Sequence, residues 1–372
     1  MPRTDRRMPR TDRRMPRTDH RMSRATVTRR THRCRRGFVL PPVFVATVCI
    51  ALLAGTMQFS AWRATQVGRL AWNGQRALHA ADEVLARTLA EWNPSAFSAA
   101  PIGSRLTRRM QSLAGVDVDV TVVRTQPLGA WIEAEARSAT NGAHRTARRR
   151  LARAVLVSAP PLPVAGALTA LAAMRIDAGG SVTGLDDASV RDECGPTRDT
   201  AAVAGVASLL RVNMTSATVR GAPAARLLVD STVRDQFESA WITMVQRAPS
   251  TDVTALRRHL AAATPWSAVV VSAPGVVLLD GAWRHEGLLA VDGDLVVRGT
   301  LTVRGMLIVR GALDTRVGVL EVDGAVLVAD RTRAGSVLGN STTVRYSQCA
   351  LRRALAAVAI PSGAPFALWQ ER

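Results

Sequence analysis

The sequence predicts an α+β protein that begins with one long helix and continues as β-structure. Three observations support this prediction. An uncharged segment of 23 residues, Phe38–Ser60, passes into a stretch with helical periodicity. Three later segments alternate apolar and polar residues, and glycine then recurs every six residues in a Val- and Leu-rich region. We expect a long transmembrane and amphipathic helix, an antiparallel β meander and a C-terminal β-rich, solenoid-like head.

The uncharged segment is long enough to cross a bilayer, which needs about 20 apolar residues at helical rise. The arginines just before it favour a cytoplasmic N-terminus: Arg29, Arg30, Arg33, Arg35 and Arg36. Pro41 and Pro42 fit the first turn, where backbone N–H groups lack helical partners. A cleaved secretory signal would have a shorter apolar run and a small-residue cleavage site. The basic flank disfavours a buried soluble helix.

Helical periodicity continues past this segment. Apolar and small residues recur mostly at three- and four-residue steps, at Val67, Leu70, Ala71, Gly74, Leu78, Ala81, Leu85, Leu89 and Trp92. Arg69, Arg76, Glu83 and Arg87 fall on other faces, and Pro94 ends the pattern. We therefore expect one spine helix over residues 38–92, apolar in its first half and amphipathic in its second.

Residues 1–37 form a basic leader built on the repeat MPRTDRR. They hold 14 Arg and 3 Asp, a large part of the chain's net charge of +20. A tract with so few apolar side chains cannot bury enough surface to fold, so we expect it to be disordered. It begins anew with Met8, Met15 and Met22, each of which is a possible translation start. All 49 basic residues are arginine and the leader has no aromatic side chain for base stacking, so we do not expect nucleic acid as a partner.

The junction of leader and helix, Arg35-Arg36-Gly37-Phe38-Val39-Leu40, resembles the type IV prepilin signal. The segment from Gln75 to Leu85, with Asp82 at the acidic position, is similar to a helix segment of minor pilins of the PilX kind and of related pseudopilins. The resemblance implies cleavage by a prepilin peptidase between Gly37 and Phe38, and assembly with other pilin subunits through the helix. Most major pilins carry Glu at the fifth mature position, where this chain has Pro42. That departure argues against a major fibre subunit.

Residues 100–160 are expected to form the meander. Val116–Val122 and Trp131–Arg137 alternate strictly, and Ala147–Val157 makes a third candidate strand. A sheet of this kind would pack against the amphipathic half of the helix. The arrangement matches the pilin plan of a helical spine laid against an antiparallel sheet.

Residues 164–350 are expected to form the solenoid-like domain, and residues 351–372 a C-terminal tail. Glycine stands at 293, 299, 305 and 311, and arginine at 298, 304 and 310. Because six is even, the repeat keeps one set of aliphatic side chains on one face: Leu295, Val297, Leu301, Val303, Leu307, Val309 and Leu313. The alternative is an ordinary meander of hairpins. Polymerising membrane-associated solenoids of the bactofilin kind have a similar texture.

The sequence contains no recognisable chemistry. Its six histidines show no metal-ligand spacing, and we find no phosphate-binding glycine loop or nucleophile elbow. We expect no enzyme activity, no cofactor and no metal site. Cys194 and Cys349 are the two cysteines of the head, and an oxidising compartment would allow a disulfide between them. Spacing alone leaves that pairing open.

These observations favour a non-enzymatic, single-pass protein of the bacterial inner membrane. Its N-terminus would be cytoplasmic and its head periplasmic, with the lipid bilayer, a prepilin peptidase and other pilin subunits as partners. We expect a minor pilin or pseudopilin of a type IV pilus or type II secretion-type filament. The alternative is a membrane-tethered β-solenoid scaffold with an uncleaved signal anchor.

Overall fold

The computed structural model of the protein describes residues 40–138, 147–186, 194, 202–229, 232–262, 264–330 and 335–362. The chain forms two compact units, with the boundary between Thr65 and Gln66. It is an α+β protein: a long apolar helix is followed by an antiparallel sheet and a curled, mostly parallel sheet.

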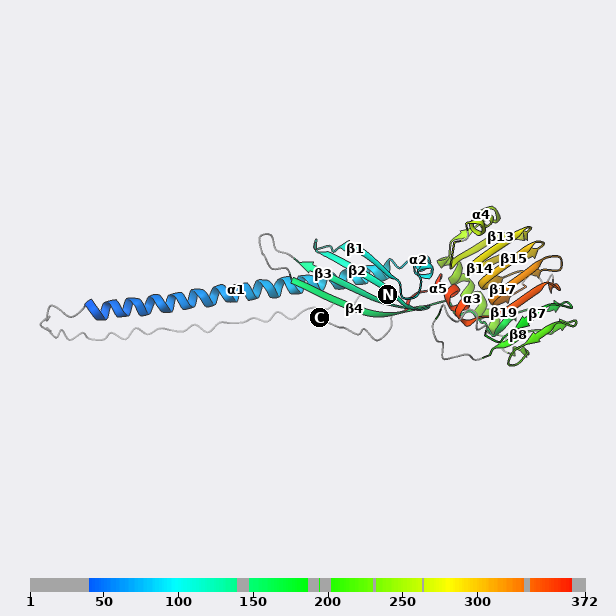
Figure 1. Cartoon of the computed structure of the whole chain (residues 1–372), viewed down its shortest axis with the longest axis horizontal. Coiled ribbons are helices and arrows are strands. Elements are labelled where there is room, and N and C mark those ends of the chain that lie inside the picture. The colour runs from blue at the N-terminus through cyan, green and yellow to red at the C-terminus, as the bar shows by residue number, and fades with distance from the viewer. Residues whose placement is uncertain are drawn as a thin grey trace, which may run out of the picture. The chain divides into compact units, whose positions relative to one another are not determined.

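Helix α1 extends from Leu40 to Ala90 (Figure 1). It contains the expected apolar and amphipathic segments. It begins two residues after and ends two residues before the predicted limits. Among the described residues it is the one helix long and apolar enough to cross a membrane. A short helix, α2 (Pro94–Ala99), follows directly. It begins at Pro94 because Asn93 caps it: the Asn93 side chain accepts a hydrogen bond from the backbone N–H of Ala96 at 3.0 Å.

The antiparallel sheet has five strands in the order β1-β2-β3-β4-β20. Their bounds are β1 (Arg105–Gln111), β2 (Asp117–Gln126), β3 (Gly129–Ser138), β4 (Ala147–Ser158) and β20 (Ile360–Ser362). The three expected strands are present as β2, β3 and β4. The sequence analysis missed β1, because its mostly polar residues lack alternation. The expectation of a tail from residue 351 was also wrong in part, since β20 pairs with β4.

The second half of α1 packs against this sheet through small side chains. Ala77, Ala81 and Val84 are fully buried and meet a sheet face that includes Val118 and Ile132. Small residues let the helix approach the strands closely. On the opposite face of the sheet, charged residues pair across neighbouring strands: Arg109 with Asp117, Arg137 with Asp119, Arg148 with Glu135, and Arg150 with Glu133. One face of the sheet is therefore core and the other carries ion pairs, as the alternation predicts.

The second sheet has 15 strands, and its pairings are parallel. We call this region the coil stack. Its N-terminal strands are β5 (Gly166–Ala170), β6 (Met174–Ile176), β7 (Ser181–Thr183), β8 (Ala204–Ser208), β9 (Val212–Met214), β10 (Thr218–Arg220) and β11 (Ala225–Leu227). Its C-terminal strands are β12 (Ser250–Thr251), β13 (Ser267–Leu279), β14 (Ala282–Val297), β15 (Thr300–Val309), β16 (Leu313–Asp314), β17 (Val319–Val328), β18 (Ser336–Leu338) and β19 (Thr342–Tyr346).

The six-residue glycine spacing sets the geometry of the coils. Ala282 pairs with Thr300 and Leu295 with Leu313, so one coil is 18 residues long, or three repeats. The seven aliphatic residues predicted to share a face are all completely buried. Glycines stack within neighbouring strands: Gly305 of β15 lies between Gly287 of β14 and Gly324 of β17 and has a φ of 137°. A Cβ on Gly305 would meet the carbonyl oxygen of Gly287 at 2.1 Å, so only glycine fits.

The coils do not stack in chain order. Leu168 of β5 pairs on one side with Val206 of β8 and on the other with Val326 of β17, so the first coil lies beside the last. From β5 the chain continues through β8, which pairs with β5, to β11, which pairs with β8. It then returns at the opposite end of the stack, where β12 pairs with β13. The link includes α3 (Thr232–Arg247), which is about 24 Å long at 1.5 Å per residue.

Two further helices complete the fold. Helix α4 (Val253–Ala261) is capped by Asp252 and lies at the β13 end of the stack (Figure 1). Helix α5 (Gln348–Ala356) follows the last coil and leads to β20 of the antiparallel sheet. In the sequence, β4 precedes the coil stack and β20 follows it. Because β4 and β20 pair with each other, the stack is an insertion between two paired strands.

Candidate assembly helix and head surface

The first half of α1 exposes nearly all its large apolar side chains. Phe44 is 68% exposed, Ile50 65% and Met57 70%, and the apolar window of the helix has no buried residue. A folded protein in water rarely leaves such a continuous apolar surface uncovered. This surface is the main candidate functional site of the described chain, and it can be covered by lipid or by other apolar helices.

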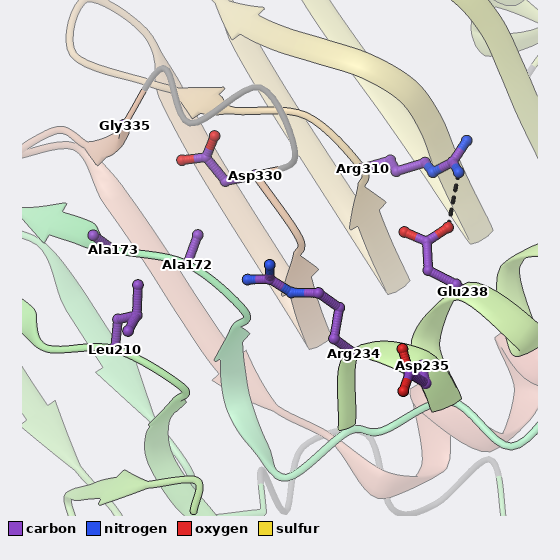
Figure 2. A pocket seen from close by; sticks show the side chains of 9 residues that line it. All are labelled: Ala172, Ala173, Leu210, Arg234, Asp235, Glu238, Arg310, Asp330 and Gly335. Carbon is purple, nitrogen blue, oxygen red and sulfur yellow. Dashed lines mark hydrogen bonds and ion pairs between the residues drawn. The ribbon is translucent and has the colours of Figure 1, made fainter. Parts of the chain in front are cut away.

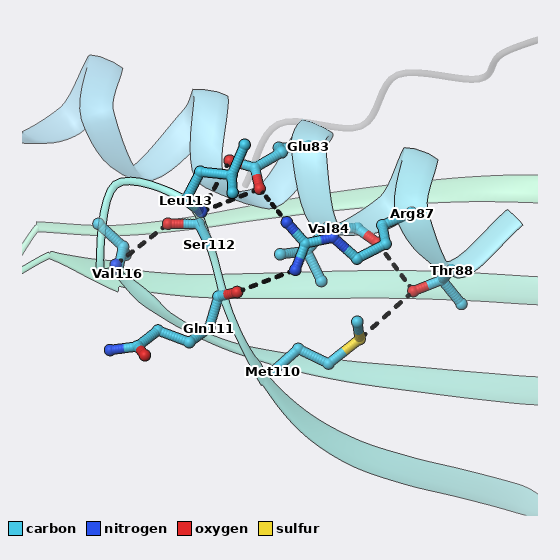
Figure 3. Close-up of polar contacts among 9 residues, drawn as sticks. All are labelled: Glu83, Val84, Arg87, Thr88, Met110, Gln111, Ser112, Leu113 and Val116. Atoms are coloured by element: carbon cyan, nitrogen blue, oxygen red, sulfur yellow. Dashed lines mark hydrogen bonds and ion pairs between the residues drawn. The ribbon is translucent and has the colours of Figure 1, made fainter. Parts of the chain in front are cut away.

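The second half of α1 is fastened to the turn between β1 and β2 by a polar clamp (Figure 3). The Glu83 carboxylate accepts hydrogen bonds from the backbone N–H of Leu113 at 2.9 and 3.2 Å and from Arg87 Nη2 at 2.5 Å. Arg87 Nη1 in turn donates to the carbonyl of Gln111 at 3.3 Å, and Arg76 donates to the carbonyl of Ala114. The clamp fixes the sheet to the helix in one register.

The sequence did not single out Glu83 as the acid of this clamp. The pilin resemblance placed the acidic position at Asp82, which is exposed, whereas Glu83 reaches the sheet. Periodicity put Glu83 outside the apolar face but could not reveal its partner, a backbone N–H 30 residues away.

A buried arginine holds the end of the spine to the head. Arg124 is 1% exposed, and its guanidinium donates to the carbonyls of Ser98, Ala100 and Pro127 at 2.7–3.1 Å. It also lies 4.8 Å from the ring centre of Phe97. Burial, together with a nearby Arg353, lowers the pKa of Arg124 to about 10. Three carbonyl acceptors compensate the desolvation, and the side chain thereby fixes α2 and its flanks.

Helix α2 contacts the coil stack through Trp266. Ser98 Oγ donates to the Trp266 carbonyl at 2.6 Å, and the Arg353 guanidinium lies 3.9 Å from the Trp266 ring centre. A disulfide joins Cys194 to Cys349, and their Cα atoms are 5.8 Å apart. Cys349 lies in the first turn of α5 and packs with Trp266. The two head cysteines are therefore brought together. Gly37 and Phe38, the predicted cleavage site, lie outside the described residues, as does the rest of the leader.

A pocket of about 760 Å³ lies beside α3 on the coil stack (Figure 2). Four of its five charged side chains are engaged in contacts with the protein. Arg310 binds Glu238 at 2.8 Å and Asp292 at 2.9 Å, and Arg234 donates to the carbonyl of Leu171 at 2.7 Å. Asp330 accepts from the backbone and side chain of Ser336. These groups hold α3 and a coil edge in place, and sequence reasoning did not identify the pocket.

The described residues contain one histidine pair but no group of three metal-ligating side chains. His259 Nε2 lies 2.9 Å from Ser267 Oγ, and the rings of His259 and His285 are 5.8 Å apart. Burial, with the charge of His259, lowers the pKa of His285 to about 4. Ser267 Oγ also lies 3.1 Å from the carbonyl oxygen of Thr264.

Comparisons with known proteins leave the family open. No protein-family model and no curated protein sequence matches the chain. One solved structure with detectable similarity is the competence-associated pilin ComZ from Thermus thermophilus. It is 10% identical to this chain, and the match covers 81% of this chain and 97% of that one, with a TM-score of 0.21. A score this low does not establish a shared fold.

Proposed function

We propose that the chain is a membrane-anchored, non-enzymatic subunit of the minor pilin or pseudopilin type. The single observation that carries the proposal is the division of α1. One uninterrupted helix of 51 residues exposes its apolar first half and is covered on one side by an antiparallel sheet along its second half. A helix of this kind can leave a bilayer and pack among other apolar helices while the same element supports a folded head.

The first half of α1 would lie in the bacterial inner membrane with its N-terminus cytoplasmic and the head periplasmic. The arginines before residue 38 support this orientation. Removal of the leader after Gly37 by a prepilin peptidase would free Phe38. The helix would then join a type IV pilus or a type II secretion-type filament through contacts with other pilin subunits.

The test is expression of the full chain with its cognate prepilin peptidase, followed by N-terminal sequencing of the membrane-bound protein. We expect a mature chain that begins with Phe38. Gly37→Leu should abolish cleavage. Gly55→Ala is the matched control, since a Cβ at Gly55 meets nothing within 4 Å, and it should be cleaved normally. An intact leader on the unmodified chain would remove the pilin proposal.

A second candidate function is a membrane-tethered scaffold that keeps its signal anchor. The parallel coil stack favours it, because stacked coils offer a rigid and extendable surface. The same experiment separates the two functions. A scaffold would retain its leader and remain in the membrane whether or not the peptidase is present.

A further inference from the structure

A small apolar groove opens between the end of α1, α2 and the first two strands of the antiparallel sheet. Its volume is about 210 Å³. Trp92 and Phe97 form its base, with their ring centres 4.9 Å apart. The strands contribute Leu106, which is 48% exposed, and Met110, whose Sδ accepts a weak hydrogen bond from Thr88 (Figure 3).

The groove adjoins an open sheet edge. Strand β1 pairs with β2 and is the first strand of the sheet, so within the described chain its other side has no neighbouring strand. Six of its seven residues are exposed. An edge of this length presents unpaired backbone N–H and C=O groups, which can accept a further strand.

The groove also contains an unsatisfied donor. The indole Nε1 of Trp92 is inaccessible to water and has no hydrogen-bond partner among the described residues. A buried N–H without a partner costs free energy, so such groups are rare in folded proteins. The Trp92 side chain lines the groove, so its indole resonance reports on what enters the groove.

The charge of β1 indicates the chemistry of the occupant. By the register with β2, Arg108 and Leu106 lie on the helix side of the sheet, and Arg105 and Arg109 lie on the other side. Arg109 already binds Asp117 at 2.7 Å. A second copy of β1 would bring arginines against arginines, which disfavours self-pairing. Arg105, on the face opposite the groove, favours a segment that carries carboxylates on that face.

We propose that β1 accepts an extended segment of another protein as a sixth strand, with apolar side chains in the groove and carboxylates on the opposite face, toward Arg105. Backbone pairing would supply affinity, and the groove and arginines would supply specificity. The surface belongs to the head, so it is available whether or not α1 is assembled in a filament.

The test uses the full chain in detergent micelles with ¹⁵N-labelled tryptophan and a synthetic peptide of alternating valine and aspartate. The indole resonance of Trp92 is assigned by its loss in Trp92→Phe. We expect the peptide to shift this resonance. Arg105→Glu should weaken binding by about tenfold, since it brings like charges together. Arg226→Glu, on an exposed strand of the coil stack, is the matched control and should bind normally.

Two results would overturn the proposal. One is an unshifted Trp92 resonance at saturating peptide. The other is equal binding by a peptide of alternating valine and lysine, because the arginines would then select nothing. Far-UV circular dichroism establishes that each variant is folded, and Arg108→Glu, on the groove side of β1, should weaken binding less than Arg105→Glu.

Discussion

Substitution of Gly305 by alanine tests the close stacking of coils in the head. Gly305 has a φ of 137°, in a region that residues with a Cβ rarely adopt. The new Cβ would lie 2.1 Å from the carbonyl oxygen of Gly287 and 2.9 Å from the Cβ of Ala354. The first contact is with backbone, so no change of rotamer can relieve it, and the coils must separate locally.

The expected cost has two parts. Backbone strain at such a φ costs about 1–2 kcal/mol, and overpacking of a tight core adds about 1–3 kcal/mol. Gly335→Ala is the matched control, because Gly335 has a φ of 84° and nothing within 4 Å of the added Cβ. It should therefore show the strain alone.

The assay is thermal unfolding of the full chain in detergent, followed by far-UV circular dichroism. For a region of this size, 1 kcal/mol corresponds to about 2–4 °C in Tm. We expect Gly305→Ala to lower the Tm of the head by about 4–20 °C, and Gly335→Ala by about 2–8 °C. Equal shifts for the two variants would refute the argument that backbone contact, rather than φ, requires glycine at position 305.

Three further predictions concern the polar contacts. Glu83→Gln should lower the free energy of unfolding of α1 and its antiparallel sheet, measured by chemical denaturation, by about 1–2 kcal/mol, because the charged acceptor of three hydrogen bonds is lost. The control Asp82→Asn, at the exposed neighbouring residue, should change this free energy little. Cys349→Ser should lower the Tm of the head, because the disulfide joins residues 155 positions apart and stabilises the fold by up to about 5 kcal/mol in the chain-entropy model. An unchanged Tm would contradict this prediction. The folded-state pKa of His285, about 4, is below its ordinary value of 6.5, so its stabilising contribution is complete above about pH 6.5 and is lost as pH falls toward 4. Lowering the pH from about 7.5 to 5 should cost about 2 kcal/mol from this residue, and His285→Gln should flatten the pH dependence of Tm, whereas His79→Gln should leave it intact.

Local pattern in the sequence was sufficient to predict which aliphatic side chains share a face, although it left an ordinary meander open. Because glycine recurs every six residues and six is even, the same aliphatic positions point to one side in each repeat. Leu295 and Val309 are both fully buried as predicted. The same regularity places Glu286, Arg304, Asp323 and Arg345 in one ladder across neighbouring coils, where opposite charges alternate and favour a single register.

The order of the coils could not be predicted in this way. Leu168 and Val326 pair although 158 residues separate them, and neither segment differs in composition from other buried strands. Strand β1 was missed for a related reason: its arginines pair with other strands or face solvent, and they erase the alternation that identifies a strand.

The candidate site likewise has one part that the sequence predicts and another that it does not. The exposed apolar half of α1 is visible in composition, because lipid or a partner helix must cover it whatever the tertiary structure is. Glu83 and Arg124 could not be recognised, because their partners are backbone groups whose positions depend on the folded sheet. A polar side chain that binds distant backbone has no signature in a single sequence.

The position of the coil stack within the chain constrains how the head is built. Ser158 ends β4 and Ile360 begins β20, and the two residues are paired. The stack therefore starts and ends at one edge of the antiparallel sheet. Ala356 and Ala359, which follow the stack, are fully buried in the helix–sheet core, and Arg247 Nη1 at the end of α3 donates to the carbonyl of Val358 at 3.3 Å. Because the return of the chain completes that core, the helix–sheet unit cannot bury all its apolar surface until the coils have closed. The two parts of the head are thus coupled in stability, although their sheets do not pair with one another.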